Sequence, residues 1–178
     1  LMWPWGHLAV GYLVWSLYTR RMYQRPPRAS ETWVVIAVTQ FPDLVDKPLA
    51  WSFSILPSGR SLAHSAFTLV LLSSLVVYIA RQYDRPTLGV AFSAAYESHL
   101  LSDALRPALA GDFGYLGYLL WPLVSVSSEE GWSLVAIARS ASIGNFSGYH
   151  GVALVCCVGL WLLDGAPGIP RRLDHSTE

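Results

Sequence analysis

The chain has 178 residues, of which 53% are hydrophobic and 13% are charged, and it includes eight Trp and nine Tyr. Soluble domains typically carry roughly 25% charged residues, so this composition favours a membrane protein. The formal net charge is zero, which excludes the basic balance expected of a nucleic-acid-binding protein. We expect a single membrane-embedded helical domain over residues 1–165 and a polar C-terminal tail over residues 166–178.

Residues 3–19 are apolar apart from His7 and one serine, and a basic, proline-rich connection follows over residues 20–28. This length just suffices for a membrane helix, which needs about 17–25 residues. A second helix is predicted over residues 31–41, because Glu31 stands near its start, where a carboxylate stabilises the helix dipole.

The second helix is interrupted at Pro42, which lacks a backbone hydrogen-bond donor and disfavours a continuing helix. Residues 41–48 are therefore predicted to form a broken helix end that carries Asp43 and Asp46. This segment is too short to cross a bilayer, so we expect it to pack inside the bundle.

Two long helices are predicted next, over residues 61–83 and 87–108, and His64 falls in the first turn of the earlier one. The later helix carries His99 and Asp103, which are four residues apart and therefore lie on one helix face, about one turn from each other. An imidazole and a carboxylate inside a membrane helix are costly and usually mark a functional site.

Residues 113–126 and 132–142 are predicted to be interfacial or re-entrant pieces. The first is interrupted by glycine and proline, and the second is only weakly amphipathic. A last helix is predicted over residues 149–163. Together these patterns predict an all-α, multi-pass transmembrane helical bundle with about five membrane helices plus interfacial or re-entrant segments.

With five spans, the cationic side chains divide unequally between the two sides of the membrane. The connections at 20–28 and 81–85 share one side with the C-terminal tail, and the positive-inside tendency makes that side cytoplasmic. The N-terminus then lies outside, and the histidines and aspartates described above fall in the outer half of the bundle. Eight cationic residues lie on the inner side (Arg20, Arg21, Arg25, Arg28, Arg81, Arg85, Arg171 and Arg172) and four on the outer side (Lys47, Arg60, Arg106 and Arg139).

Three histidines and up to three aspartates thus meet near one end of the bundle. Any one histidine is more often a hydrogen-bonded packing residue than a ligand, but the convergence of several indicates a metal site. Imidazole nitrogen and carboxylate oxygen suit Zn²⁺, Mn²⁺ or Fe²⁺. We therefore predict one or two divalent ions, with zinc preferred, on a set of five ligands: His7, Asp43, His64, His99 and Asp103.

The same end of the bundle offers side chains that suit hydrolysis. Asp46 or Asp43 would orient or deprotonate a water molecule, and Arg60 or Arg106 would hold an anion. A divalent ion lowers the pKa of bound water toward neutrality, which makes that water a nucleophile. The two arginines are equally compatible with a role as anchors whose side chains reach from the membrane toward water.

Several short motifs follow one another over roughly residues 1–125: His7, Pro42-Asp43 followed by Asp46, Arg60 with His64-Ser65, His99-x3-Asp103, and Trp121-Pro122-Leu123. In this order they resemble the membrane-bound predicted metal-dependent hydrolases, the family of the LexA-regulated bacterial inner-membrane protein. The resemblance implies a multi-pass protein of the cytoplasmic (inner) membrane of a prokaryote.

More distantly, the order His, Asp, His, His-x3-Asp is similar to that of zinc-dependent phospholipase C and the P1-type nucleases. That similarity implies that Asp103 bridges two metal ions and that His7 helps to hold one of them. Asp43, His64 and His99 would hold the other ion.

The predicted function is metal-dependent hydrolysis of a phosphoester or lipid headgroup by a membrane-bound enzyme with its site toward the outer face. Membrane lipid and a phosphoester substrate are the expected partners, and no nucleic acid is expected. The alternative is a non-catalytic membrane protein, either an ion carrier or a metal-stabilised scaffold, because intramembrane His and Asp also mark ion pathways. The apolar inner halves of the helices favour a one-sided site over a carrier.

Overall fold

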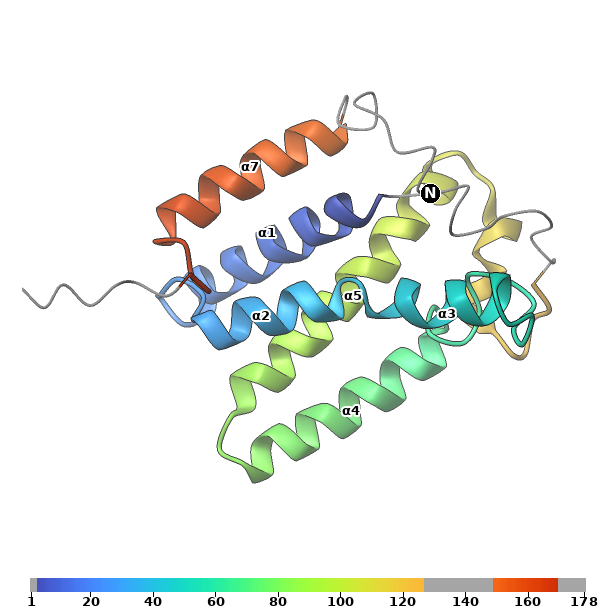
Figure 1. The fold of residues 1–178 in the computed structure, drawn as a ribbon, viewed down its shortest axis with the longest axis horizontal. Coiled ribbons are helices and arrows are strands. Elements are labelled where there is room, and N and C mark those ends of the chain that lie inside the picture. The colour runs from blue at the N-terminus through green and yellow to red at the C-terminus, as the bar shows by residue number, and fades with distance from the viewer. Residues whose placement is uncertain (1–2, 127–148, 170–178) are drawn as a thin grey trace, which may run out of the picture.

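The computed structural model describes residues 3–126 and 149–169 (Figure 1). Within these ranges the chain forms six α-helices and one 3₁₀-helix and contains no strand, so the predicted all-α fold is confirmed. The elements in chain order are α1 (Pro4–Met22), α2 (Ala29–Val38), α3 (Phe41–Trp51), α4 (Ala66–Gln82), α5 (Pro86–Leu109), the 3₁₀-helix η1 (Phe113–Leu120) and α7 (Tyr149–Leu163).

Helix α5 is the centre of the bundle and packs against α1, α2, α3, α4 and η1 (Figure 1). It starts at Pro86, in a first-turn position where the missing N–H of proline costs no helical hydrogen bond. A Cβ on Gly89 would lie 2.8 Å from the Cα of Val77 in α4, so the glycine lets these two helices approach closely. The main core is formed by seven buried residues of α1, α2 and α5: Trp15, Val35, Val38, Ala91, Ala95, Tyr96 and Leu100.

The buried carboxylate of Asp164 fastens α7 to α1. It accepts hydrogen bonds from the Tyr12 hydroxyl (2.7 Å) and the Ser16 hydroxyl (2.6 Å). The Arg20 Nε donates a third bond at 2.8 Å. The three donors recur every four residues and therefore line one face of α1. As a result, α7 and α1 end side by side.

The helix connections gather at two ends of the bundle. The α1–α2 connection, the α4–α5 turn and the end of α7 lie at one end, on the left of Figure 1. The start of α1, the α2–α3 junction and the start of α4 lie toward the other. Arg25, in the α1–α2 connection, donates two hydrogen bonds of 2.9 and 2.6 Å to Glu31 in α2. The basic connections and the predicted histidine site are therefore far apart along the bundle.

Residues 41–48 form the start of a separate helix, which corrects the prediction of a broken helix end. Pro42 occupies the first turn of α3, where proline is well tolerated, so it starts a helix instead of only ending one. This helix gives Asp43 and Asp46 fixed positions, and both side chains are buried.

Helix α4 begins at Ala66, later than the predicted start near residue 61. Ser65 caps it, and the Ser65 hydroxyl accepts a hydrogen bond from the backbone N–H of Phe67. His64 consequently lies in the loop before α4 and not in a helical turn.

No helix in the described part of the chain has both the length and the sustained hydropathy needed to cross a bilayer. The five membrane helices therefore remain a prediction from the sequence. The predicted interfacial piece at 132–142 and the end of the tail, from residue 170 onward, lie outside the described residues.

Candidate metal centre

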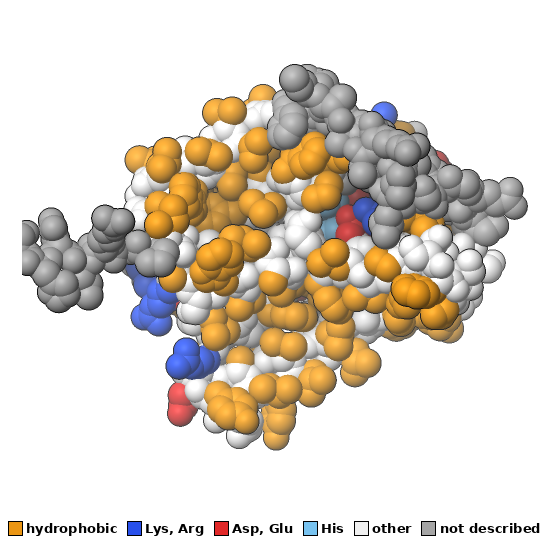
Figure 2. Space-filling model, in the orientation of Figure 1, with side chains coloured by type: hydrophobic (Ala, Val, Ile, Leu, Met, Phe, Trp, Pro, Cys, Tyr) orange, Lys and Arg blue, Asp and Glu red, His pale blue; other side chains and the backbone are white. Residues whose placement is uncertain are grey.

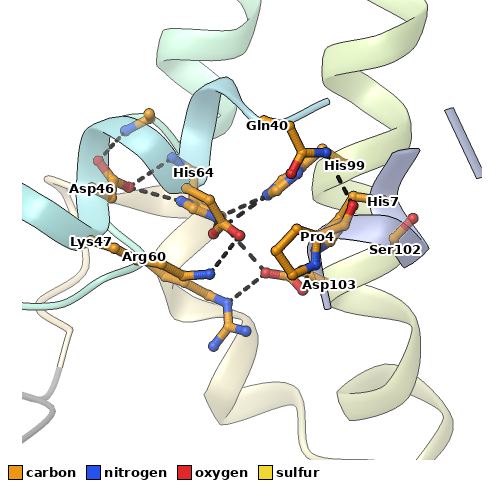
Figure 3. A network of polar contacts seen from close by, with 12 residues as sticks. Pro4, His7, Gln40, Asp46, Lys47, Arg60, His64, His99, Ser102 and Asp103 are labelled. Atoms are coloured by element: carbon orange, nitrogen blue, oxygen red, sulfur yellow. Dashed lines mark hydrogen bonds and ion pairs between the residues drawn. The ribbon is translucent and has the colours of Figure 1, made fainter. Parts of the chain in front are cut away.

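The histidines and aspartates predicted from the sequence converge at one end of the bundle (Figure 3). One histidine comes from the first turns of α1, two aspartates come from α3, and a second histidine comes from the loop before α4. The last two residues lie one turn apart on α5. All six are buried, with Asp43 the most exposed at 8%: His7, Asp43, Asp46, His64, His99 and Asp103.

Five of these residues form two groups that could each hold a metal ion, and we call these five residues the His/Asp cluster. In each group, one ligand atom per residue lies within 4.8 Å of the others. His99 belongs to both groups, whereas the resemblance to phospholipase C gave the shared position to Asp103. The first group is His7, His99 and Asp103, and the second is Asp43, His64 and His99.

Asp46 stands behind His64 and sets the orientation of its ring. The Asp46 Oδ2 lies 2.8 Å from the His64 Nδ1, and a carboxylate can only accept, so Nδ1 carries the proton. The same carboxylate accepts backbone N–H bonds from Ser61 (2.8 Å), Ala63 (2.8 Å) and His64 (3.1 Å). Asp46 thus holds the loop in place and, in the neutral ring, leaves the His64 Nε2 free to bind a metal ion. Residues behind metal-bound histidines commonly have this role.

His99 is held in the same way by the backbone. Its Nδ1 lies 2.7 Å from the carbonyl oxygen of Thr39, at the end of α2. A carbonyl only accepts, so this nitrogen is the donor and the His99 Nε2 is unprotonated in the neutral ring. Helix α2 therefore fixes both the tautomer and the direction of the ligand on α5.

The Nε2 atoms of the two rings face each other, with 3.1 Å between that of His64 and that of His99, and in the neutral rings neither carries a proton. Two lone pairs at this distance repel and cannot form a hydrogen bond, so the arrangement requires a proton or a cation between them. Two histidine nitrogens on one tetrahedral zinc ion stand about 3.3 Å apart. The observed separation therefore fits a shared metal ion.

Buried atoms without hydrogen-bond partners surround the same centre. Among the described residues, no hydrogen bond reaches the Asp43 Oδ1, the Asp103 Oδ1 or the His7 Nδ1. The Asp43 Oδ1 lies 3.5 Å from the His64 Nε2, and the Asp103 Oδ1 lies 3.4 Å from the His7 Nε2. Unpartnered buried polar atoms are costly and few in folded proteins. A metal ion would satisfy both carboxylate oxygens, so the residues present fit such a group.

Two cations adjoin the carboxylates of the His/Asp cluster. The Lys47 Nζ lies 2.5 Å from the Asp43 Oδ2, and the Arg60 Nε lies 2.7 Å from the Asp103 Oδ2. Burial by itself raises the pKa of Asp43, but its contact with the His64 ring and the charge of Lys47 outweigh burial and lower the pKa below the usual value. Asp43 is therefore ionised at neutral pH, in the form that binds a metal.

Two tyrosines of η1 complete the surroundings, and sequence reasoning missed them. The Arg60 guanidinium donates a 2.5 Å hydrogen bond to the Tyr115 hydroxyl, and the ring of Tyr118 lies 6.1 Å from the ring of His64. Tyr115 and Tyr118 are three residues apart, the spacing that aligns side chains on a 3₁₀-helix. The hydroxyl of Ser65 donates to the Trp121 carbonyl oxygen at 2.6 Å, which fastens the end of η1 beside the loop.

Arg106, the second predicted anion-binding arginine, does not join this arrangement. It lies one turn beyond Asp103 on α5, is exposed, and lines an apolar groove beside α1 and α7. Arg60 is the arginine at the centre, where it is only 4% exposed.

The described residues thus define a helical protein with a buried cluster of histidines and carboxylates at one end. A family model for the YdjM inner membrane proteins matches residues 2–166. The chain belongs to this family, which supports a location in the inner membrane and is silent on hydrolase activity or any likeness to phospholipase C. No curated protein and no solved structure matches the chain significantly.

Proposed function

We propose that this protein is a metal-dependent hydrolase of the inner membrane, with one or two divalent ions held by the His/Asp cluster. The observation that carries the proposal is the short distance of 3.1 Å between the His64 Nε2 and the His99 Nε2, beside the unpartnered carboxylate oxygens of Asp43 and Asp103. Acceptors behind both rings bind their Nδ1 atoms, so the contact needs either a second proton on one ring or a cation between the rings. Burial lowers the pKa of His64, but its contacts with Asp43 and Asp46 outweigh burial and raise the pKa, so in the absence of metal the proton lies on His64. A bound divalent ion takes the place of that proton.

The donor set favours zinc, with manganese and iron as the next choices. It offers imidazole nitrogens and carboxylate oxygens, and neither cysteine of the chain belongs to the two groups. When bound, such an ion lowers the pKa of a water molecule and polarises a phosphoryl oxygen.

Three residues at the candidate metal site have different proposed roles. Asp46 lies behind the His64 ring and positions it. This positioning role replaces the activation of water predicted for Asp46 from the sequence. Asp43 belongs to the His/Asp cluster, and its carboxylate would bind the ion or accept a proton. Arg60, hydrogen-bonded to Asp103, supplies a positive charge beside the carboxylates, which suits an anionic substrate.

A phosphoester, either a lipid headgroup or a related soluble compound, is the proposed substrate. The surface supports a lipid environment, because large apolar side chains such as Leu71, Leu109 and Leu163 are 68%, 81% and 79% exposed. Figure 2 shows hydrophobic side chains over much of one face, with a small group of His, acidic and basic side chains visible among them.

Removal of the metal tests the proposal. We expect protein purified in detergent to hydrolyse members of a panel of phosphate monoesters and diesters, to lose this activity on dialysis against a chelator, and to regain it with Zn²⁺ or Mn²⁺. A Glu97→Gln variant, altered at an exposed position of α5, should behave like the wild type. Bound metal without turnover on the whole panel would contradict the hydrolase and favour the non-catalytic alternative, an ion carrier or a metal-stabilised scaffold.

A further inference from the structure

A separate cavity of about 260 Å³ opens between the loop before α4 and η1, next to the His/Asp cluster. We call it the η1 pocket. It is smaller than the roughly 300–1,000 Å³ of sites for drug-sized ligands, so it suits a compact group and not a nucleotide. Its lining includes Ser58, Arg60, Gly114, Tyr115, Tyr118 and Ser125.

Tyr118 brings an unpartnered donor to the η1 pocket. Its side chain is 2% exposed, and among the described residues its hydroxyl has no hydrogen-bond partner. A buried hydroxyl without a partner costs free energy, so the position indicates a ligand atom. Burial, together with the nearby Asp103 carboxylate, raises the pKa of Tyr118, and the hydroxyl therefore keeps its proton at neutral pH.

Arg60 connects the η1 pocket with the metal centre. Its Nε donates to the Asp103 Oδ2, and its NH1 group donates to the Tyr115 hydroxyl, so the guanidinium stands between the two. The residues that line the pocket include this arginine and hydroxyl groups but no Asp or Glu, at least among those that the structure describes. The pocket is therefore complementary to an anion.

We propose that the η1 pocket binds the terminal phosphate of a phosphate monoester, with the Arg60 guanidinium and the Tyr118 hydroxyl as its donors. This assignment deepens and rests on the proposed function, because it names the substrate class of the same site. A monoester phosphate has three unesterified oxygens, enough to meet the arginine, the tyrosine and the metal centre at once. A diester has only two unesterified oxygens, so one of these three partners would lack an oxygen to bind.

Inorganic phosphate is the direct probe of the η1 pocket. We expect isothermal titration calorimetry to show phosphate binding to the full-length protein, and Tyr118→Phe to weaken it about tenfold or more, since a hydrogen bond to a charged group is lost. The phenyl ring keeps the packing against His64, so metal content should not change. Ser125→Leu, which fills the exposed rim of the pocket, should weaken phosphate binding as well.

Tyr78→Phe is the matched control. It makes the same chemical change as Tyr118→Phe, but at a position on α4 that is 62% exposed. The titration is run on metal-loaded and on chelator-treated protein, so that loss of the metal and loss of the pocket are separate results. Equal phosphate affinity in wild type and Tyr118→Phe in both preparations would overturn the assignment, whatever the metal content.

Competition experiments distinguish a soluble phosphate ester from a lipid headgroup as the source of the phosphate. Glycerol 3-phosphate represents a soluble ester, and dioctanoyl phosphatidic acid in detergent micelles represents a lipid headgroup. Displacement of inorganic phosphate by the first supports a soluble substrate, and displacement by the second alone supports a lipid. If neither compound displaces phosphate, the pocket does not take phosphate monoesters and the proposal fails.

Discussion

Replacing His99 by alanine is expected to remove the bound metal almost entirely and to abolish metal-dependent hydrolysis. His99 is the one residue shared by both candidate groups, so its loss breaks each of them. Changes to residues that merely support a ligand typically cost 10–100-fold in metal affinity, and the loss of a shared ligand should therefore cost more than about 100-fold. Elemental analysis of the purified variant after dialysis measures the effect.

The His99 ring also stacks on His7, with 3.9 Å between ring centroids, so the alanine variant could lose metal through poor packing. A second variant, His99→Gln, fills most of the space but lacks the imidazole. We expect both variants to lose the metal while the glutamine variant keeps the thermal stability of chelator-treated wild type. The Glu97→Gln protein, altered on the same helix, is the control. Full metal content in both His99 variants would show that this histidine is a packing residue.

The second large effect is expected at Asp46, which does not face the centre. Asp46→Asn should lower metal affinity by 10–100-fold, because the neutral amide no longer holds the His64 ring with a charged acceptor. Asp46→Ala should lower it further and also reduce thermal stability, since it leaves the backbone N–H groups of Ser61 and Ala63 without their acceptor. Metal titration and thermal denaturation of the two variants measure these effects.

The Asp46 variants also separate two roles for this carboxylate. If Asp46 acts through His64, metal affinity and turnover fall together, and saturating metal restores a large part of the activity of Asp46→Asn. If instead Asp46 activates water directly, turnover is lost while metal affinity stays at the wild-type level. That second result would contradict the positioning role. It would support the prediction from the sequence that Asp46 orients or deprotonates a water molecule.

Much of the candidate site could be predicted because helical geometry and topology constrain it. The i, i+4 spacing of His99 and Asp103 places both on one face of α5 whatever the rest of the chain does. Counting helices then brings His7 and His64 to the same end. Both inferences depend only on local periodicity and on the alternation of helix direction, which a sequence displays directly.

What could not be predicted depends on contacts between segments far apart in the chain. Asp46 accepts hydrogen bonds from a loop 15 or more residues away, and no spacing rule shows that it faces away from the centre. The η1 tyrosines lie in a stretch where glycine and proline interrupt any helical or strand pattern, so nothing in the sequence placed Tyr118 beside His64. The predicted start of α4 near residue 61 is wrong for a related reason: the Asp46 carboxylate and the Ser65 cap hold residues 61–65 in a loop.

The central claim is that the facing His64 and His99 nitrogens hold a metal ion, and X-ray absorption at the zinc K edge tests it most directly. Zinc-loaded wild-type protein should show a shell of nitrogen and oxygen ligands at about 2.0–2.2 Å, with histidine scattering and no sulfur at about 2.3 Å. The histidine scattering should decrease in the His64→Gln variant. A sulfur shell, or a spectrum that is the same in wild type and His64→Gln, would contradict the claim.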